Sequence, residues 1–243
     1  MKEARYFYVP NASSEHELPM DEALHALRVL RLKSGDELFL MDGKGTFYQA
    51  EVTIAATKRC LYEIRKTLPQ QKTWRGRIHI AMAPTKMMDR VEWFVEKATE
   101  IGVDEFSFLN TAFSERKSMR NIRLEKIVVA AMKQSRKPWK PIVNTLIPFK
   151  EFINQNRQGH RFIAHCYDEI EREDLFTLLT EPTTMTSDDE ITVMIGPEGD
   201  FSVGEVKMAI DNGYRSVTLG KARLRTETAA LSAAMIAQLS RRL

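Results

Sequence analysis

The sequence predicts an α/β protein in which a small β-rich domain precedes a larger domain of alternating strands and helices. Three observations predict this fold class. Short runs rich in aromatic and β-branched residues fill the first part of the chain, a polar stretch with a proline follows them, and strand and helix patterns alternate from there on. At 243 residues the chain can bury one large or two modest cores.

The N-terminal part reads as strands over 5–9, 37–41, 46–57 and 60–66, with a glycine-rich turn at Asp42-Gly43-Lys44-Gly45. One helix is expected over 21–30. In that helix the leucines at 24, 27 and 30 suit a core face, and the basic residues are left for solvent or RNA. Because 69–74 is polar and without period, we place the domains at 1–70 and 75–243.

The larger domain shows strand patterns at 77–83, 105–109, 162–165, 191–195 and 216–219, and helix patterns at 89–101, 122–135, 203–212 and 228–241. Such alternation predicts a mostly parallel sheet with helices on both faces. Ligands of such folds bind beyond the carboxyl ends of the strands.

Two glycine loops, 195–202 and 219–228, each follow an apolar run and precede a helix. Glycine lets the backbone approach a ligand closely, so the two loops could frame one small-molecule site. Ser202 with Glu205 forms a capping box, Gly213 ends that helix, and Thr226 or Thr228 can cap the next one. Neither loop matches a dinucleotide or P-loop pattern. Taken alone, each loop could equally be a tight turn.

Two helices carry polar faces beside their core faces. On 89–101, Arg90, Trp93, Lys97 and Glu100 share one arc, which is either a solvated, salt-bridged surface or part of a binding face. On 122–135 and just beyond it, basic residues at helical spacing suit a phosphate backbone: Arg123, Lys126, Lys133 and Lys137.

The charge is unevenly distributed, although the formal net charge is only +3. Residues 114–140 carry about +7 and residues 168–190 about −8. A strongly basic region of this kind typically meets phosphate, with a solvated helix face as the alternative.

Several functional classes are not supported. Cys60 and Cys166 stand outside any CxxC pair, so we expect two free thiols and no zinc or other metal site. His25 is more often structural than catalytic when no acid or cysteine accompanies it. Without a signal-peptide pattern or a membrane-length apolar stretch, we expect a cytoplasmic protein.

Six sets of residues, in order along nearly the whole chain, resemble the RsmE family of 16S rRNA uridine-N3 methyltransferases, in the SPOUT superfamily of trefoil-knotted enzymes. They are Arg5-Tyr6-Phe7, residues 25–31, Lys86 with Asp89-Arg90-Val91-Glu92-Trp93 through Lys97-Ala98-Thr99-Glu100-Ile101-Gly102, Ser114-Glu115-Arg116, Gln134-Ser135-Arg136, and both glycine loops.

The resemblance implies a PUA-like RNA-binding β-barrel followed by a knotted α/β domain that binds S-adenosylmethionine and works as a homodimer. Its substrate would be 16S rRNA within the 30S subunit. The residues that would bind the cofactor are Ile195, Gly196, Pro197, Gly199, Leu219, Gly220, Leu224, Arg225, Thr226, Thr228 and Ala229.

For catalysis, Glu198 or Glu227 is a possible base for the N3 proton, and Arg225 could stabilise charge on the uracil carbonyls. RNA binding is expected of Arg5, His25, Arg28, Arg31, Lys86, Arg90, Lys97, Arg116, Arg123, Lys133 and Arg136.

The sequence departs from the family pattern at three places. Asp200 stands where a second glycine is usual, Ala222-Arg223 where arginine and an aliphatic residue are usual, and Lys133 where an acid is common. Two other functions share many of these features. One is a SPOUT enzyme that methylates ribose 2′-OH, and the other is an RNA-binding ribosome-assembly factor without chemistry.

Overall fold

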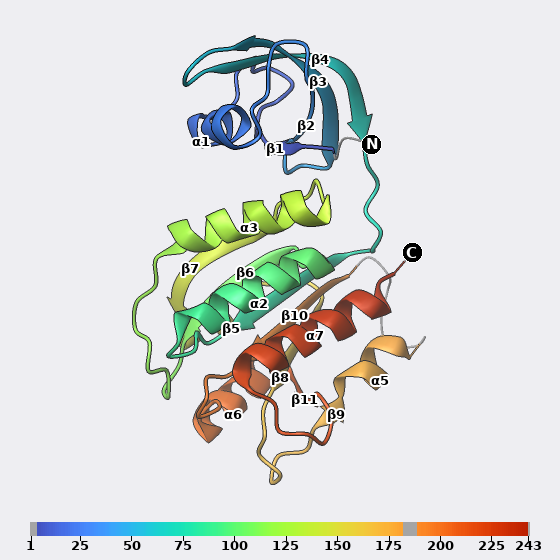
Figure 1. The fold of residues 1–243 in the computed structure, drawn as a ribbon. Helices are drawn as coiled ribbons and strands as arrows, with labels where there is room; N and C mark the ends of the chain where they lie inside the picture. The colour runs from blue at the N-terminus through green and yellow to red at the C-terminus, as the bar shows by residue number, and fades with distance from the viewer. Residues whose placement is uncertain (1–3, 182–188, 243) are drawn as a thin grey trace. The chain divides into compact units, whose positions relative to one another are not determined.

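The computed structural model describes residues 4–181 and 189–242 (Figure 1). Asp188 of the acidic stretch therefore lies outside the described residues. The chain forms two compact units. The first comprises Met1–Lys72 with Met132–Lys140, and the second comprises Thr73–Ala131 with Pro141–Leu243.

The first unit is built on a four-stranded sheet in the order β1-β2-β3-β4. β1 pairs with β2 in parallel, and the other two pairings are antiparallel. Phe7, Leu38 and Tyr62 lie in its buried core. Its elements are β1 (Tyr6–Tyr8), α1 (Met20–Leu24), η1 (His25–Val29), β2 (Glu37–Met41), β3 (Thr46–Ala55) and β4 (Cys60–Pro69).

The expected N-terminal helix is present, but it changes from α to π geometry at His25. The prediction of its core face was partly wrong. Ala23 and Ala26 are the fully buried positions, whereas Leu27 and Leu30 are partly buried against the core. A π turn holds more residues than an α turn, so the α-helical period used for the prediction fails there.

The segment 132–140 belongs to the first unit because it packs on the predicted turn between β2 and β3. Gly45 donates its N–H to the Pro138 carbonyl at 2.9 Å, and Lys140 donates to the Gly43 carbonyl at 2.9 Å. A Cβ on Gly45 would lie 2.8 Å from Nε1 of Trp139, and the φ of Gly45 is +109°. This turn therefore requires glycine.

The second unit contains a seven-stranded sheet in the order β7-β6-β5-β10-β8-β11-β9, and every neighbouring pair is parallel. The predicted parallel α/β sheet is confirmed. Its strands are β5 (Arg77–Met82), β6 (Glu105–Asn110), β7 (Ile142–Pro148), β8 (His160–Ala164), β9 (Glu173–Asp174), β10 (Glu190–Ile195) and β11 (Arg215–Thr218).

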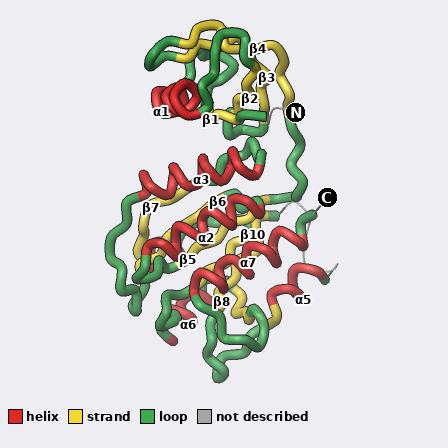
Figure 2. The backbone as a smooth tube through the Cα atoms, in the orientation of Figure 1, coloured by secondary structure: helices red, strands yellow, loops and turns green. Residues whose placement is uncertain are grey.

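Helices cover both faces of this sheet, as predicted. On one face α2 and α7 lie side by side (Figures 1 and 2). On the other face, α4 and α6 pack with Ala81 and Met194 of the sheet in one buried cluster. Among the described residues, no helix is long and apolar enough to cross a membrane. The helices are α2 (Met88–Ile101), α3 (Asn121–Ser135, whose residues from Met132 on belong to the first unit), α4 (Phe149–Ile153), α5 (Leu175–Thr180), α6 (Val203–Asp211) and α7 (Thr226–Ser240).

Four elements were not predicted: β7, α4, β9 and α5. β7 is an edge strand whose residues are exposed or half-buried, and Pro148 ends it. It therefore lacks the apolar run of a central strand. The prolines just before it and at its end are typical of a loop. β9, α4 and α5 are too short for a periodic pattern.

A buried polar network lies near the amino ends of the central strands. Arg157 Nη1 is 2.9 Å from Nδ1 of His79, and Nε2 of His79 is 2.9 Å from Oγ of Ser107. Since guanidinium only donates, Nδ1 of His79 accepts and Nε2 carries the proton. Burial lowers the pKa of His79 well below 6.5, and Arg157 adds to this effect. The imidazole is therefore neutral.

The same network contains a group with the composition of a metal site. Ligand atoms of His79, Glu105 and Glu190 lie within 4.8 Å of one another. The sequence spacing did not indicate this cluster because its members come from three strands. Nη2 of Arg157 is 3.4 Å from Oε1 of Glu105, and Nη1 is 3.6 Å from Oε1 of Glu190. The guanidinium thus supplies the positive charge that these carboxylates need.

We expect the protein to lose stability in mild acid because of His79. Its folded pKa lies below the usual 6.5, so the unfolded chain takes up the proton first. The stabilisation is complete above pH 6.5 and is lost as the pH falls toward the folded pKa. His79→Gln should reduce the drop in the urea midpoint between about pH 7.5 and pH 5.5. His16→Gln, at an exposed position, is the control; equal drops in both variants would contradict the assignment.

Candidate functional site

The two glycine loops lie at the carboxyl edge of the parallel sheet. The first follows β10, which lies between β5 and β8, and the second follows β11, on the other side of β8. From β5 the chain continues to β6 and β7 on one side, whereas β8, β9 and β11 lie on the other. The loop after β10 therefore stands where the strand order changes direction, which is the usual ligand position in open α/β sheets.

The first glycine loop is a tight reversal that requires glycine. A Cβ on Gly196 would lie 2.9 Å from the backbone nitrogen of Phe201, closer than real Cβ contacts. A Cβ on Gly199 would meet Phe113 at 3.3 Å. The predicted capping box of Ser202 and Glu205 is confirmed, as is the helix end at Gly213, whose φ is +82°.

Contacts from the loop after β5 hold this first loop in place. Ala83 donates its N–H to the Ile195 carbonyl at 2.9 Å, and Lys86 donates its N–H to Oε1 of Glu198 at 3.0 Å. Arg116 in turn donates to the carbonyls of Thr85 at 3.2 Å and Lys86 at 2.6 Å. The structure thus brings together Lys86, Arg116 and Glu198, which the sequence placed in separate motifs.

The second glycine loop is more open. Gly220 has a φ of +112°, and nothing lies within 4 Å of the position that its Cβ would occupy. Lys221, Ala222 and Arg223 are exposed, and Leu219 and Leu224 are half-buried. The backbone at Gly220 can therefore be approached closely by a ligand.

The helix after this loop begins differently from the prediction. Arg225 is the N-cap of α7, and its side chain makes no capping hydrogen bond with the helix. Thr226 is buried in the first turn and Thr228 is exposed, so the prediction that either one caps the helix was wrong. An uncapped helix start leaves backbone N–H groups available to a ligand. The exposed Arg225 and the half-buried Ala229 lie at this end of the helix.

The two candidate carboxylates lie in different environments. Glu198 is exposed, and its Oε1 accepts the N–H of Lys86. Glu227 is buried, and within the described part of the chain its Oε2 has no hydrogen-bond partner. Oε1 of Glu227 lies 3.8 Å from Nε of Arg90, on α2. Glu227 is therefore the buried carboxylate of the two, and one of its oxygens is buried without a hydrogen bond to any described residue.

Asp200, where glycine is usual, adopts the left-handed backbone conformation with a φ of +65°. Its Oδ2 accepts the N–H of Cys166 at 2.7 Å, and its Oδ1 accepts the N–H of Phe201 at 2.7 Å. The second departure, Ala222-Arg223, is exposed in the open loop. Both departures thus lie in the candidate ligand loops.

Several predicted RNA-binding cations of α2 and α3 are already paired with acids. Nζ of Lys97 lies 2.7 Å from Glu96 and 3.0 Å from Glu100, and the two glutamates raise the pKa of Lys97. Nε of Arg123 lies 2.5 Å from Oε1 of Glu92. These pairs favour the salt-bridged alternative for this part of the basic face.

Other predicted RNA-binding residues lie in the first unit. Lys133 donates to both carboxylate oxygens of Glu22, at 2.8 and 3.0 Å, and Arg136 lies over the Tyr6 ring. His25, Arg28 and Arg31 are exposed and Arg5 is half-buried. Across residues 4–181 and 189–242, no acid pairs with Arg28 or Arg31. These two arginines are therefore available to phosphate.

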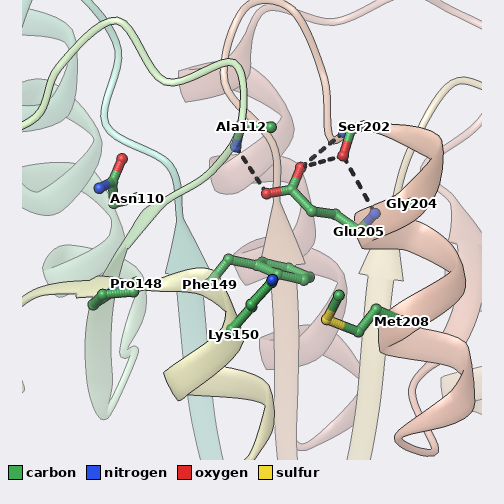
Figure 3. A pocket seen from close by; sticks show the side chains of 9 residues that line it. All are labelled: Asn110, Ala112, Pro148, Phe149, Lys150, Ser202, Gly204, Glu205 and Met208. Carbon is green, nitrogen blue, oxygen red and sulfur yellow. Dashed lines mark hydrogen bonds between the residues drawn. The ribbon is translucent and has the colours of Figure 1, made fainter.

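A hollow of about 470 Å³ opens beside the first loop, at the carboxyl ends of β6 and β7 (Figure 3). Phe149 and Met208 give it apolar walls, and Asn110 and Lys150 add polar groups. Glu205 links its two sides, since Oε1 accepts the Ala112 N–H at 2.8 Å and Oε2 accepts the Ser202 N–H at 2.9 Å. Sequence reasoning missed this hollow because it missed β7 and α4.

Comparison with known families gives two matches. A family model described as an RNA methyltransferase domain matches residues 72–238. A model described as an RNA methyltransferase PUA domain matches residues 18–64.

Individual proteins agree with these matches. The ribosomal RNA small subunit methyltransferase E of Rickettsia conorii is 29% identical over 223 residues, covering 91% of this chain and 88% of that protein. Its namesake from Synechocystis is 29% identical over 209 residues, covering 85% of this chain and 67% of that protein.

Two solved structures share the fold over 98% of both chains. A probable rRNA-methyltransferase from Porphyromonas gingivalis has a TM-score of 0.86 and 40% sequence identity. A ribosomal RNA small subunit methyltransferase E from Neisseria gonorrhoeae, bound to S-adenosyl methionine, has a TM-score of 0.83 and 26% identity.

The tight reversal at Gly196 gives a stability prediction. Gly196→Ala should cost about 1–3 kcal/mol, because the added methyl group would meet backbone rather than a side chain that can turn away. Gly204→Ala is the matched control, since nothing lies within 4 Å of its Cβ position and alanine favours the helix by up to about 1 kcal/mol. Urea unfolding measures both changes. Equal stability of the two variants would refute the constraint.

Proposed function

The chain belongs to the RNA methyltransferase family, and from this premise we propose that it transfers a methyl group from S-adenosylmethionine to N3 of one uridine in the 16S rRNA of the small ribosomal subunit. Family membership and the relatives named ribosomal RNA small subunit methyltransferase E support methyl transfer to rRNA. The relative with bound S-adenosylmethionine supports that donor. The observation that carries the proposal is the pair of glycine loops at the carboxyl edge of the parallel sheet, the first of them where the strand order changes direction in this shared fold.

The loops suit a small ligand with a polar edge. Gly220 leaves space above its backbone, the start of α7 has no side-chain cap, and Gly196 keeps the first loop tight. Backbone N–H and C=O groups of this kind can hold the adenine and the amino-acid part of the donor. We assign this role to Ile195, Gly196, Pro197, Gly199, Leu219, Gly220, Leu224, Arg225, Thr226, Thr228 and Ala229.

The donor supplies a methyl group already activated by its sulfonium. The chain must therefore align N3 of the uracil for in-line attack and accept the proton that N3 loses. Glu227 suits the base role better than Glu198, because it is buried and its Oε2 has no partner within the described residues, whereas Glu198 is exposed to water. Arg225, exposed at the start of α7, can stabilise the charge that develops on the uracil carbonyls.

We assign RNA binding to the first unit, with residues 1–70 as a PUA-like β-barrel domain and 75–243 as the methyltransferase domain. The PUA family match and the two exposed arginines, Arg28 and Arg31, support this division. Since 16S rRNA is assembled into the 30S subunit in the cytoplasm, we place the enzyme there.

We further propose that the second unit is knotted at its C-terminal loops and works as a homodimer. Trp93 on α2 and Met235 and Leu239 on α7 are exposed large apolar side chains on two helices that pack together. Such side chains are typical of a surface that a second copy covers.

The decisive experiment is mass spectrometry of nucleosides from 30S subunits treated with the protein and S-adenosylmethionine. We expect 3-methyluridine to appear with the wild-type protein, and to be strongly reduced with Glu227→Gln, since loss of a general base costs about 10²–10⁴ in rate. A 2′-O-methylated nucleoside instead would assign the protein to ribose methylation. No product, with no heat on titrating the cofactor, would favour a non-catalytic assembly factor.

A second prediction concerns RNA affinity. Replacing Arg28 and Arg31 by glutamine should weaken RNA binding and lower the slope of log K against log salt by about 1.4 to 2, since each phosphate contact contributes about 0.7 to 0.9. Lys133→Gln should change the slope less, because its ammonium is already paired with Glu22. Filter binding over a range of salt concentrations measures both. An unchanged slope in the double variant would assign both arginines to solvent.

A further inference from the structure

We propose that Asp200 is a positioning residue that fixes the two glycine loops relative to each other through the loop that follows β8. The inference rests on the proposed function, in which both loops hold the methyl donor. It concerns a residue that does not itself need to touch that donor.

The backbone at Asp200 shows that its side chain has a specific role. In the described residues only Arg31, Arg136 and Asp200 combine a side chain with a positive φ. The left-handed region costs most residues about 1 kcal/mol or more and costs glycine nothing. Aspartate enters this region more readily than most residues because its short side chain can hydrogen-bond locally, so the contacts of its carboxylate show what it does there.

Both oxygens of the Asp200 carboxylate make short hydrogen bonds. Oδ1 accepts the N–H of Phe201 at 2.7 Å, which stabilises the bend of the first loop itself. Oδ2 accepts the N–H of Cys166 at 2.7 Å, and Cys166 lies just beyond the end of β8 at Ala164. A charged acceptor makes such bonds about twice as strong as a neutral one does. Asp200 thus joins the loops that follow β10 and β8.

The residues on either side of Cys166 make further hydrogen bonds, and one of these reaches β11. Tyr167 donates its hydroxyl to the Phe201 carbonyl at 2.6 Å and its N–H to Nδ1 of His165 at 3.2 Å. Nε2 of His165 lies 2.6 Å from Oγ of Ser216, in β11. Burial lowers the pKa of His165, which keeps the ring neutral with Nδ1 free to accept and Nε2 as the donor.

The position of β8 in the sheet explains which loops these hydrogen bonds connect. β8 lies between β10 and β11, so residues 165–167 stand between the first and the second glycine loop. Asp200 anchors one end of the series and Ser216 the other. A site formed by two separate loops binds more tightly when their spacing is set before the ligand arrives, because less ordering remains to be done on binding. The hydrogen-bonded series from Asp200 to Ser216 sets that spacing.

Three variants test the role by calorimetry with S-adenosylmethionine. Asp200→Gly keeps the left-handed backbone and removes both bonds, so the dissociation constant should rise about tenfold or more. Asp200→Asn tolerates the same backbone and retains one acceptor oxygen, so it should stay within about threefold of the wild type. Asp211→Asn, at an exposed residue of α6, is the control and should bind as the wild type does.

Amide hydrogen exchange without cofactor tests the same inference independently. Asp200→Gly should exchange faster than the wild type in both 196–201 and 219–225, and Ser216→Ala should speed exchange in 219–225. Faster exchange confined to 196–201 would overturn the inference, and so would unchanged cofactor affinity of Asp200→Gly. A wild-type protein that binds no S-adenosylmethionine would instead refute the proposed function, while the exchange result would still decide whether Asp200 couples the loops.

Discussion

The position of β10 between β5 and β8 is the constraint on which the rest of the second unit depends. β10 pairs in parallel with both neighbours, and residues of both its faces are buried. The chain must therefore leave the sheet at its centre, at Ile195, and turn sharply to reach α6. Gly196 permits that turn, and the loops after β5 and β8 then contact it through Glu198 and Asp200. The ligand loops are a consequence of this strand order.

Much of the fold was predictable because it depends on local patterns. The ends of β2 were predicted as observed, and α2 and α3 begin one residue earlier than predicted. Elements whose burial is incomplete, such as the edge strand β7, carry no comparable signal. The π turn at His25 also escaped prediction, since the pattern of leucines there reads as an ordinary α-helix.

The candidate site was predictable in its loops but not in its contacts. Glycines between a strand and a helix indicate a ligand loop locally, whereas the partner of Asp200 is Cys166 and the partner of Lys133 is Glu22, far away in the sequence. Basic residues predicted from helical spacing to face RNA therefore include some that are not free to bind phosphate, because acids from distant segments neutralise their charge. Glu92 has the same effect on Arg123 from the neighbouring helix α2.

The segment 132–140 makes the first unit discontinuous in sequence. During synthesis, the turn at Gly43 and Gly45 must wait for its partners Pro138 and Lys140 to leave the ribosome. By then the emerged chain is about twice as long as the N-terminal strand region. A fragment cut at residue 72 would lack these hydrogen bonds and would expose the glycine turn to water. The unit that contains the PUA match is thus completed by residues 132–140, which lie within the methyltransferase match. A gene divided between the two matches would encode the first unit without this segment.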